Sequence, residues 1–259
     1  YVGQINDLHN ERNPPVVSYS RMPPKSKSSR TNTLKDDKKQ TKISTPIKKF
    51  SESSKWPSFL LKSDLQLQTL LENQIVVIPS FLTHQECTNL INFIEKNIPL
   101  EQTVPNKGEA FRNNDRFSIE NPKFAESLYQ SGLNSLVSHW KSFVSTKKSV
   151  VGLNSNIRIY KYSTGQQFGQ HYDDFAKDSL GRMSEWTLLI YLNGGHNEVD
   201  VPLSGGETVF YKAKRGEIVV APERGMALLH KHGHDCLLHE AKEVKRGNKY
   251  VLRSDLMFA

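Results

Sequence analysis

The stretch "NIRIYKYSTGQQFGQHYDDF", residues 156–175, decides the predicted fold. It contains two short runs rich in apolar and aromatic residues, separated by a turn that includes Gly165. Such runs are typical of β-strands. Six further runs follow: "WTLLIYLN" (186–193), "GETVFY" (206–211), "EIVVAP" (217–222), "MALLHK" (226–231), "CLLHEA" (236–241) and "NKYVLRSDLMF" (248–258). Eight short strands within about 100 residues predict a closed or double-sheet antiparallel structure of jelly-roll type.

Helices are predicted before this β region. "NQIVVIPSF" (73–81) indicates a buried strand, and "LTHQECTNLINFIEKN" (82–97) indicates an amphipathic helix that starts with a capping box at Thr83 and Glu86. A second helix is predicted over 122–143 with a break near Gly132, and residues 99–122 are predicted to be a long loop. Helices followed by strands indicate an α+β fold rather than a doubly wound sheet.

The N-terminal 55 residues differ from the rest of the chain. Residues 22–55 contain ten basic and three acidic side chains, so they carry +7 of the net charge of +8. Few large apolar residues accompany this charge, which predicts a disordered basic segment over 1–55. Residues 1–21 lack an initiating methionine, and we interpret them as non-native or as lying upstream of a start at Met22. The ordered domain is then 56–259, with the jelly roll from about 153.

This basic segment predicts either weak contact with nucleic acid through residues 22–55, a nuclear import signal, or a solvated tail with no partner. No run is long and apolar enough for a membrane span, so we expect no membrane contact. The cysteines are Cys87 and Cys236, too few for a disulfide framework or a cysteine-based zinc site. A cytoplasmic or nuclear location is therefore predicted, and the oligomeric state is left open.

His171 and Asp173 in "FGQHYDDF" form a candidate metal-binding pair. Residues i and i+2 of a strand point to the same face, so these two side chains project together while Tyr172 points away. His239 on a later strand is the candidate third ligand. Two imidazoles and one carboxylate are typical of non-haem Fe(II) oxygenases, with a surface turn, or zinc or manganese in a cupin-like barrel, as alternatives. A second, weaker candidate site is the alternating run His230, His232 and His234.

Two cations share one face of the last predicted strand. Lys249 and Arg253 alternate with Val251, and a buried cation is costly unless it is paired. No run of acidic residues supplies an obvious partner, which favours an anionic ligand. The alternatives are that these side chains reach solvent from a barrel rim or that one of them pairs with Asp255.

Five blocks of the sequence together resemble the prolyl 4-hydroxylase-type branch of the Fe(II)- and 2-oxoglutarate-dependent dioxygenases. They are "IPSFLTHQECTNLI", "YKYSTGQQFGQHYDDF", "LLIYLN", "PLSGGETVFY" and "LLHEAKEVKRGNKYVLRSD", and they span about Gln74 to Phe258. The resemblance implies a double-stranded β-helix (jelly-roll) core with N-terminal supporting helices. It also implies iron ligands at His171, Asp173 and His239.

The same resemblance implies a 2-oxoglutarate site. Lys249 matches the basic residue that binds the far carboxylate, Tyr191 a tyrosine that hydrogen-bonds it, and Tyr162 a tyrosine that lines the pocket. Arg253 is a second basic residue that could share the carboxylate, and which cation makes the closer contact is left open. Core packing is the alternative role for both tyrosines.

The implied activity is hydroxylation of a C–H bond with release of succinate and CO2. Fe(II) is the implied metal, 2-oxoglutarate and O2 are the implied cosubstrates, and ascorbate is a candidate reductant. A prolyl or other residue of an intracellular protein is the expected substrate, and "FRNNDRF" (111–117) matches substrate-contacting segments of relatives or is a surface loop. The alternatives are a dioxygenase for a small molecule and a catalytically weak, basic-tailed nucleic-acid-binding module.

Overall fold

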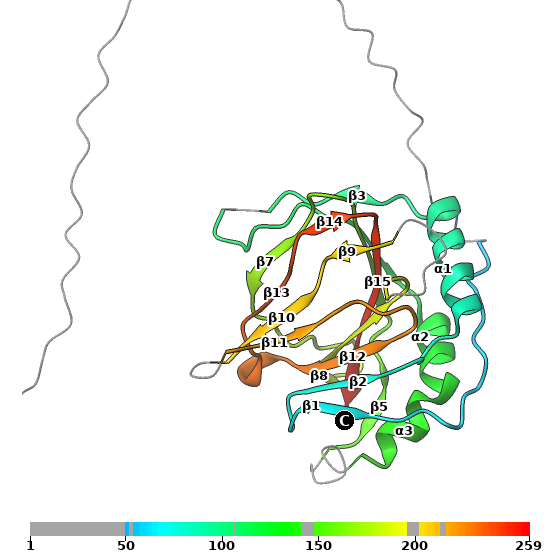
Figure 1. Ribbon diagram of the computed structural model, residues 1–259. Helices are drawn as coiled ribbons and strands as arrows, with labels where there is room; N and C mark the ends of the chain where they lie inside the picture. Colours follow the sequence, from blue (N-terminus) through cyan, green and yellow to red (C-terminus); the bar gives the residue numbers. More distant parts are fainter. Residues whose placement is uncertain (1–49, 52–53, 106, 141–147, 196–201, 213–215) are drawn as a thin grey trace, which may run out of the picture. The chain divides into compact units, whose positions relative to one another are not determined.

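The computed structural model describes residues 50–259 except 52–53, 106, 141–147, 196–201 and 213–215 (Figure 1). The predictions for the tail through residue 49 therefore lie outside the described residues. Phe50 is the first described residue, and its ring centroid lies 6.3 Å from that of Trp56 and 5.5 Å from that of Phe117. The packed region thus includes Phe50, six residues before the predicted boundary, because this aromatic side chain is held against the domain.

Two antiparallel sheets face each other and form the centre of the fold. The large sheet has the order β1-β2-β12-β8-β15-β6-β4-β3, with β5 paired to β15. Its strands are β1 (Gln68–Leu71), β2 (Ile75–Ile78), β3 (Glu101–Gln102), β4 (Asp115–Glu120), β5 (Val150–Leu153), β6 (Asn156–Tyr162), β8 (Met183–Tyr191), β12 (Ala227–Lys231) and β15 (Lys249–Phe258).

The small sheet has the order β11-β10-β13-β7, and β9 and β14 form a separate pair. These strands are β7 (Phe168–His171), β9 (Ser204–Gly205), β10 (Thr208–Tyr211), β11 (Glu217–Val220), β13 (His239–Ala241) and β14 (Val244–Arg246). All eight strands predicted from residue 156 onward are present, and the predicted α+β class with a jelly-roll core is confirmed.

Strand alternation separates two hydrophobic clusters across the large sheet. Val76 and Leu252 belong to the cluster on the helical side, whereas Val77 and Val251, one residue away, belong to the cluster between the sheets. Because neighbouring strand residues point to opposite faces, β2 and β15 each contribute to both clusters. Lys249 and Arg253 share the inner face with Val251, as predicted.

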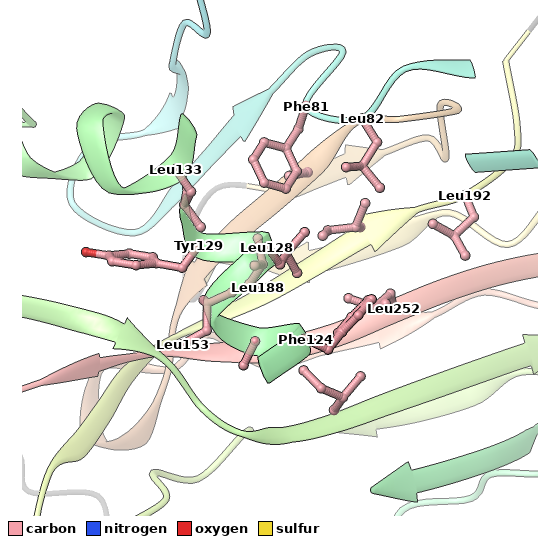
Figure 2. Packing of buried hydrophobic residues seen from close by; sticks show 14 of the residues in the cluster. Phe81, Leu82, Phe124, Leu128, Tyr129, Leu133, Leu153, Leu188, Leu192 and Leu252 are labelled. Carbon is pink, nitrogen blue, oxygen red and sulfur yellow. The ribbon is translucent and has the colours of Figure 1, made fainter. Parts of the chain in front are cut away.

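The helices cover the outer face of the large sheet (Figure 1). They are α1 (His84–Asn97), α2 (Pro122–Leu128), the π-helical turn Tyr129–Leu133 and α3 (Asn134–Ser138). Figure 2 shows Phe124, Leu128 and Leu133 from this helical layer close to Leu188 and Leu252 from the sheet. Burial of this apolar surface is the main force that holds the helices in place.

Both predicted helix features are present. The Thr83 side chain accepts a hydrogen bond from the backbone N–H of Glu86, while the Glu86 carboxylate accepts one from the Thr83 N–H, which confirms the capping box. The predicted break lies at Gly132, whose φ is 130°. A Cβ at Gly132 would lie 2.4 Å from the Lys62 carbonyl oxygen, so the close passage of the chain requires glycine.

The predicted loop over residues 99–122 is wrong, because it contains β3 and β4. Strand β4 pairs along β6, with Phe117 opposite Ile159 and Ile119 opposite Ile157. Its outer positions are charged or polar and none of its residues is fully buried, so its apolar alternation is weak in the sequence. Pairing with a strong neighbouring strand, rather than local pattern, forms this element.

No helix among the described residues has the length and the apolar character needed to cross a membrane.

Candidate active site

The structure brings the three predicted metal ligands together between the sheets. His171 ends β7, Asp173 follows two residues later, and His239 begins β13. The antiparallel pairing of β13 with β7 sets His239 directly opposite His171. One ligand atom from each of the three side chains lies within 4.8 Å of the other two. The register between β13 and β7 therefore brings His239, the predicted third ligand, next to the other two.

Hydrogen bonds fix which nitrogen of each imidazole faces this cluster. His171 Nδ1 lies 2.8 Å from the Gly169 carbonyl oxygen, and His239 Nδ1 lies 2.9 Å from the Leu237 carbonyl oxygen. A carbonyl oxygen only accepts, so both Nδ1 atoms carry the proton and both Nε2 atoms present a lone pair. The two Nε2 atoms lie 3.6 and 3.8 Å from the carboxylate of Asp173.

The protonation states also suit a metal ligand set. Burial, assisted by the neighbouring His239, lowers the pKa of His171 to about 4. Burial opposes ionisation of Asp173, but the positive charge of Arg253 holds the pKa of that carboxyl well below its usual range. At neutral pH the cluster therefore offers two neutral imidazoles and one carboxylate, the forms that bind a divalent cation.

Lys249 lies in the same inner pocket and is almost completely buried, with 2% of its surface exposed. Its Nζ donates a 2.6 Å hydrogen bond to the Gly206 carbonyl oxygen and makes no ion pair with any carboxylate among the described residues. Burial lowers the pKa of Lys249 to about 7, an effect that Glu207 partly offsets. A buried ammonium group with only a neutral partner is the environment expected for an anion-binding residue.

Both predicted tyrosines flank this ammonium group. Lys249 Nζ lies 5.1 Å from the ring centroid of Tyr162 and 5.3 Å from that of Tyr191. Tyr162 lines the pocket, while the Tyr191 hydroxyl is 2.7 Å from Thr208 Oγ1, a pocket-lining residue that the sequence reasoning missed. Thr208 and Tyr162 line the same pocket as Lys249 and the three candidate ligands.

Arg253 also lines the pocket, but its nearest partners are acidic. Its Nη1 donates a 2.9 Å hydrogen bond to Asp173 Oδ1, and its Nη2 lies 3.5 Å from Asp255 Oδ1. The expectation that no internal acidic partner exists is therefore wrong for Arg253, because Asp173, which follows β7 and is distant in the chain, supplies one. For Lys249 the expectation holds, because its ammonium group has no carboxylate partner among the described residues.

The alternating histidines do not form an independent metal site. His230 Nε2 lies 3.5 Å from Asp173 Oδ2, whereas His232 hydrogen-bonds Thr187 and Ser184. His230 can be grouped with Cys236 and His239, but that group shares His239 with the first cluster. The two buried histidines thus border the predicted site, and Thr187 joins them without any signal in the sequence.

The segment "FRNNDRF" runs beside β7 at the edge of the small sheet. The Phe111 carbonyl oxygen accepts a 2.7 Å hydrogen bond from the Gly169 N–H, and Arg112 forms a β-bridge with Phe168. The Arg112 guanidinium carbon lies 4.0 Å from the ring centroid of Phe168, whose ring also stacks on His171 at 3.7 Å. This segment is therefore adjacent to the wall of the pocket.

Comparison with known proteins identifies this arrangement. Residues 157–254, which include the three candidate ligands and every residue that lines the pocket, match the family model of the 2OG-Fe(II) oxygenase superfamily. This part of the chain is a 2OG-Fe(II) oxygenase domain. The predicted family is thereby confirmed, and Fe(II), 2-oxoglutarate and O2 are the cofactor and cosubstrates of this 2OG-Fe(II) oxygenase. No curated protein sequence matches the chain.

Solved structures share the fold of this 2OG-Fe(II) oxygenase. One is the viral collagen prolyl hydroxylase of Paramecium bursaria Chlorella virus-1 in its 2OG complex, at 20% identity and a TM-score of 0.50 over 71% of this chain and 96% of that chain. Another is a prolyl hydroxylase from Trichoplax adhaerens bound to a hypoxia inducible factor peptide, at 18% identity and a TM-score of 0.51 over 71% and 84%. They confirm the predicted double-stranded β-helix core.

Proposed function

We propose that this oxygenase hydroxylates a side chain of a polypeptide, with prolyl residues as the first candidates. In this proposal His171, Asp173 and His239 hold Fe(II), and Lys249 anchors the far carboxylate of 2-oxoglutarate. The observation that carries the proposal is the buried Lys249 ammonium group, which has no carboxylate partner among the described residues and lies in the same pocket as the three ligands. An anionic cosubstrate would supply the missing charge.

Fe(II) with 2-oxoglutarate and O2 supplies the oxidation: one oxygen atom enters the C–H bond, and the other enters succinate as CO2 is lost. The protein's own residues bind, orient and shield. The two imidazoles present Nε2 because their Nδ1 protons are held by carbonyl oxygens. Tyr162 and Tyr191 flank the Lys249 ammonium group and exclude water from it. Asp173 supplies the carboxylate of the cluster.

Exposed aromatic side chains near the cluster support a polypeptide substrate. Two of them follow His171 closely in the sequence, and the third belongs to the segment that hydrogen-bonds β7. Tyr172 is 65% exposed, Phe111 is 53% exposed and Phe175 is 48% exposed. Exposed apolar groups beside a catalytic pocket are typical of surfaces that bind a partner. The Trichoplax structure, with its bound peptide, suggests the same class of substrate by fold alone.

The test is turnover of the purified full chain loaded anaerobically with Fe(II). We expect succinate to form from 2-oxoglutarate on exposure to O2, with ascorbate present as reductant. Proline-containing peptides should gain the mass of one oxygen atom. The Asp173→Ala variant should remain folded but form neither succinate nor the hydroxylated peptide. Absence of succinate with every peptide and in uncoupled reactions would contradict the oxygenase assignment.

The same assay separates the alternatives. Turnover with small-molecule candidates, but with no peptide, would support the small-molecule oxygenase. Nucleic-acid binding without turnover, lost on deletion of residues 22–55, would support the binding module. We also propose a reducing compartment, cytoplasm or nucleus, because Cys87 and Cys236 are free and buried. Imaging of a fluorescent fusion tests this location.

A further inference from the structure

The carboxylate of Asp173 is held from two sides by buried donors. Arg253 Nη1 donates to Oδ1 at 2.9 Å, and Thr187 Oγ1 donates to Oδ2 at 2.8 Å. Thr187 is fully buried, and Asp173 and Arg253 are 7% and 9% exposed. Hydrogen bonds to a charged group in such a site are stronger than those between neutral groups. The orientation of this carboxylate is therefore set by two side chains that are not among the three ligands.

On the first side, Arg253 is occupied by carboxylates. Its guanidinium group contacts Asp173 through Nη1 and approaches Asp255 through Nη2 at 3.5 Å. An arginine stays protonated in proteins, so this buried charge needs these partners. Lys249, four residues earlier on the same face of β15, instead contacts the neutral Gly206 carbonyl. The two cations on one strand face thus have separate partners and separate roles.

On the second side, the direction of each hydrogen bond can be deduced. The Asp173 carboxylate only accepts, so the Thr187 hydroxyl donates its proton to Asp173. The Thr187 oxygen must then accept from His232 Nδ1 at 2.9 Å. His232 Nε2 in turn lies 2.9 Å from Ser184 Oγ, which accepts from the Ala176 N–H. His232 therefore keeps the Thr187 proton directed at Asp173.

We propose that Arg253 and Thr187 are positioning residues that hold the Asp173 carboxylate in the orientation required for metal binding. The proposal rests on the proposed role of Asp173 as a ligand. A ligand already fixed in place loses less conformational entropy when the metal binds. Removal of such a supporting contact typically weakens metal binding about 10- to 100-fold. Arg253 then contributes to metal affinity, and Lys249 to 2-oxoglutarate affinity.

The test is a titration of the purified full chain with Mn²⁺ alone, in which free Mn²⁺ is measured by electron paramagnetic resonance. We expect Arg253→Gln and Thr187→Val each to raise the Mn²⁺ dissociation constant about 10-fold or more. Thr187→Ser keeps the hydroxyl and should stay within about 3-fold of wild type. The matched control is Arg158→Gln, because Arg158 is the cross-strand neighbour of Arg253 and approaches Asp255 at 3.4 Å but makes no described contact with Asp173.

A second titration, with 2-oxoglutarate at saturating Mn²⁺, separates the two roles of the cations. Arg253→Gln should bind 2-oxoglutarate nearly as wild type does, whereas Lys249→Met should bind Mn²⁺ normally and 2-oxoglutarate poorly. Wild-type Mn²⁺ affinity in Arg253→Gln, with weakened 2-oxoglutarate binding, would overturn the proposal and make Arg253 a cosubstrate anchor. If Arg253→Gln does not fold, Thr187→Val decides, and wild-type Mn²⁺ affinity there overturns it.

Failure of the proposed function gives a different result. In that case wild type and Asp173→Ala would bind Mn²⁺ equally, because Asp173 would not be a ligand. A third outcome overturns the positioning role alone. In that outcome Asp173→Ala loses Mn²⁺ binding, whereas Arg253→Gln and Thr187→Val keep the wild-type Mn²⁺ affinity.

Discussion

Lys249 Nζ lies 2.6 Å from the carbonyl oxygen of Gly206, and this is the only hydrogen bond that the ammonium group makes with the described residues. A neutral carbonyl cannot balance a buried positive charge, so the site favours an anion. Because Gly206 belongs to the "PLSGGETVFY" block, that block also takes part in the proposed cosubstrate site.

Replacement of Lys249 by methionine is expected to weaken 2-oxoglutarate binding about 10- to 100-fold at saturating Mn²⁺. The estimate corresponds to loss of a hydrogen bond to a charged group, about 1.5–3 kcal/mol. Isothermal titration calorimetry measures it. Lys242→Met is the control, because Lys242 pairs with Glu240 at the pocket without entering the proposed anchor. A larger effect in Arg253→Ala than in Lys249→Ala would move the anchor to Arg253.

The affinity for 2-oxoglutarate is expected to depend on pH. Burial lowers the pKa of Lys249 to about 7, and only the protonated form attracts a dianion. Below this pKa the Lys249 amine is protonated in the free protein, so the dissociation constant for 2-oxoglutarate should not change with pH. Above it the protonated fraction falls, so the dissociation constant should rise, approaching about tenfold per pH unit. Calorimetric titrations from pH 6 to 9 test this, and Lys249→Arg should remove the slope; the same slope in that variant would contradict the assignment to Lys249.

Gly206→Ala should impair cosubstrate binding as well as stability. A Cβ there would lie 3.1 Å from Lys249 Cδ, and the φ of +75° is strained for alanine. We expect about 1 kcal/mol of lost stability and a severalfold weaker affinity for 2-oxoglutarate. Gly216→Ala is the matched control, since its φ of +68° is similar and its Cβ would meet nothing within 4 Å. Equal 2-oxoglutarate affinities in the two variants would show that the Lys249 position does not depend on Gly206.

Glu86 is expected to matter more for stability than its capping partner. Thr83→Ala removes one capping hydrogen bond, at a cost of about 1 kcal/mol. Glu86→Ala removes the other capping hydrogen bond, which the Thr83 N–H donates to Glu86 Oε2, and also leaves the partly buried Lys62 Nζ, now 2.8 Å from Glu86 Oε1, without its carboxylate. The loss should then be about 3 kcal/mol. Urea unfolding midpoints compare the two variants, and equal losses would mean that the Lys62 contact adds nothing.

Features with a local period could be predicted well from the sequence. The eight strands from residue 156 onward, the inward face shared by Lys249 and Arg253, and the capping box at Thr83 each depend on neighbours a few residues apart. Strand β4 could not be predicted, because its half-exposed residues give a weak pattern and its hydrogen bonds come from β6. The site shows the same division. The two-residue spacing of His171 and Asp173 predicted that their side chains lie together, whereas His239 comes opposite His171 only through the pairing of β13 with β7.

The sequence by itself determined which chemical groups are available: two histidines, a carboxylate and two cations placed on strands of known direction. Only the tertiary structure decided how they pair. The register of β13 against β7 places His239 opposite His171, and packing between the sheets gives Arg253 to Asp173 and leaves Lys249 with a carbonyl. The physical reason is that alternation is a property of one strand, whereas ligand clusters and charge partners form between strands that are distant in the chain.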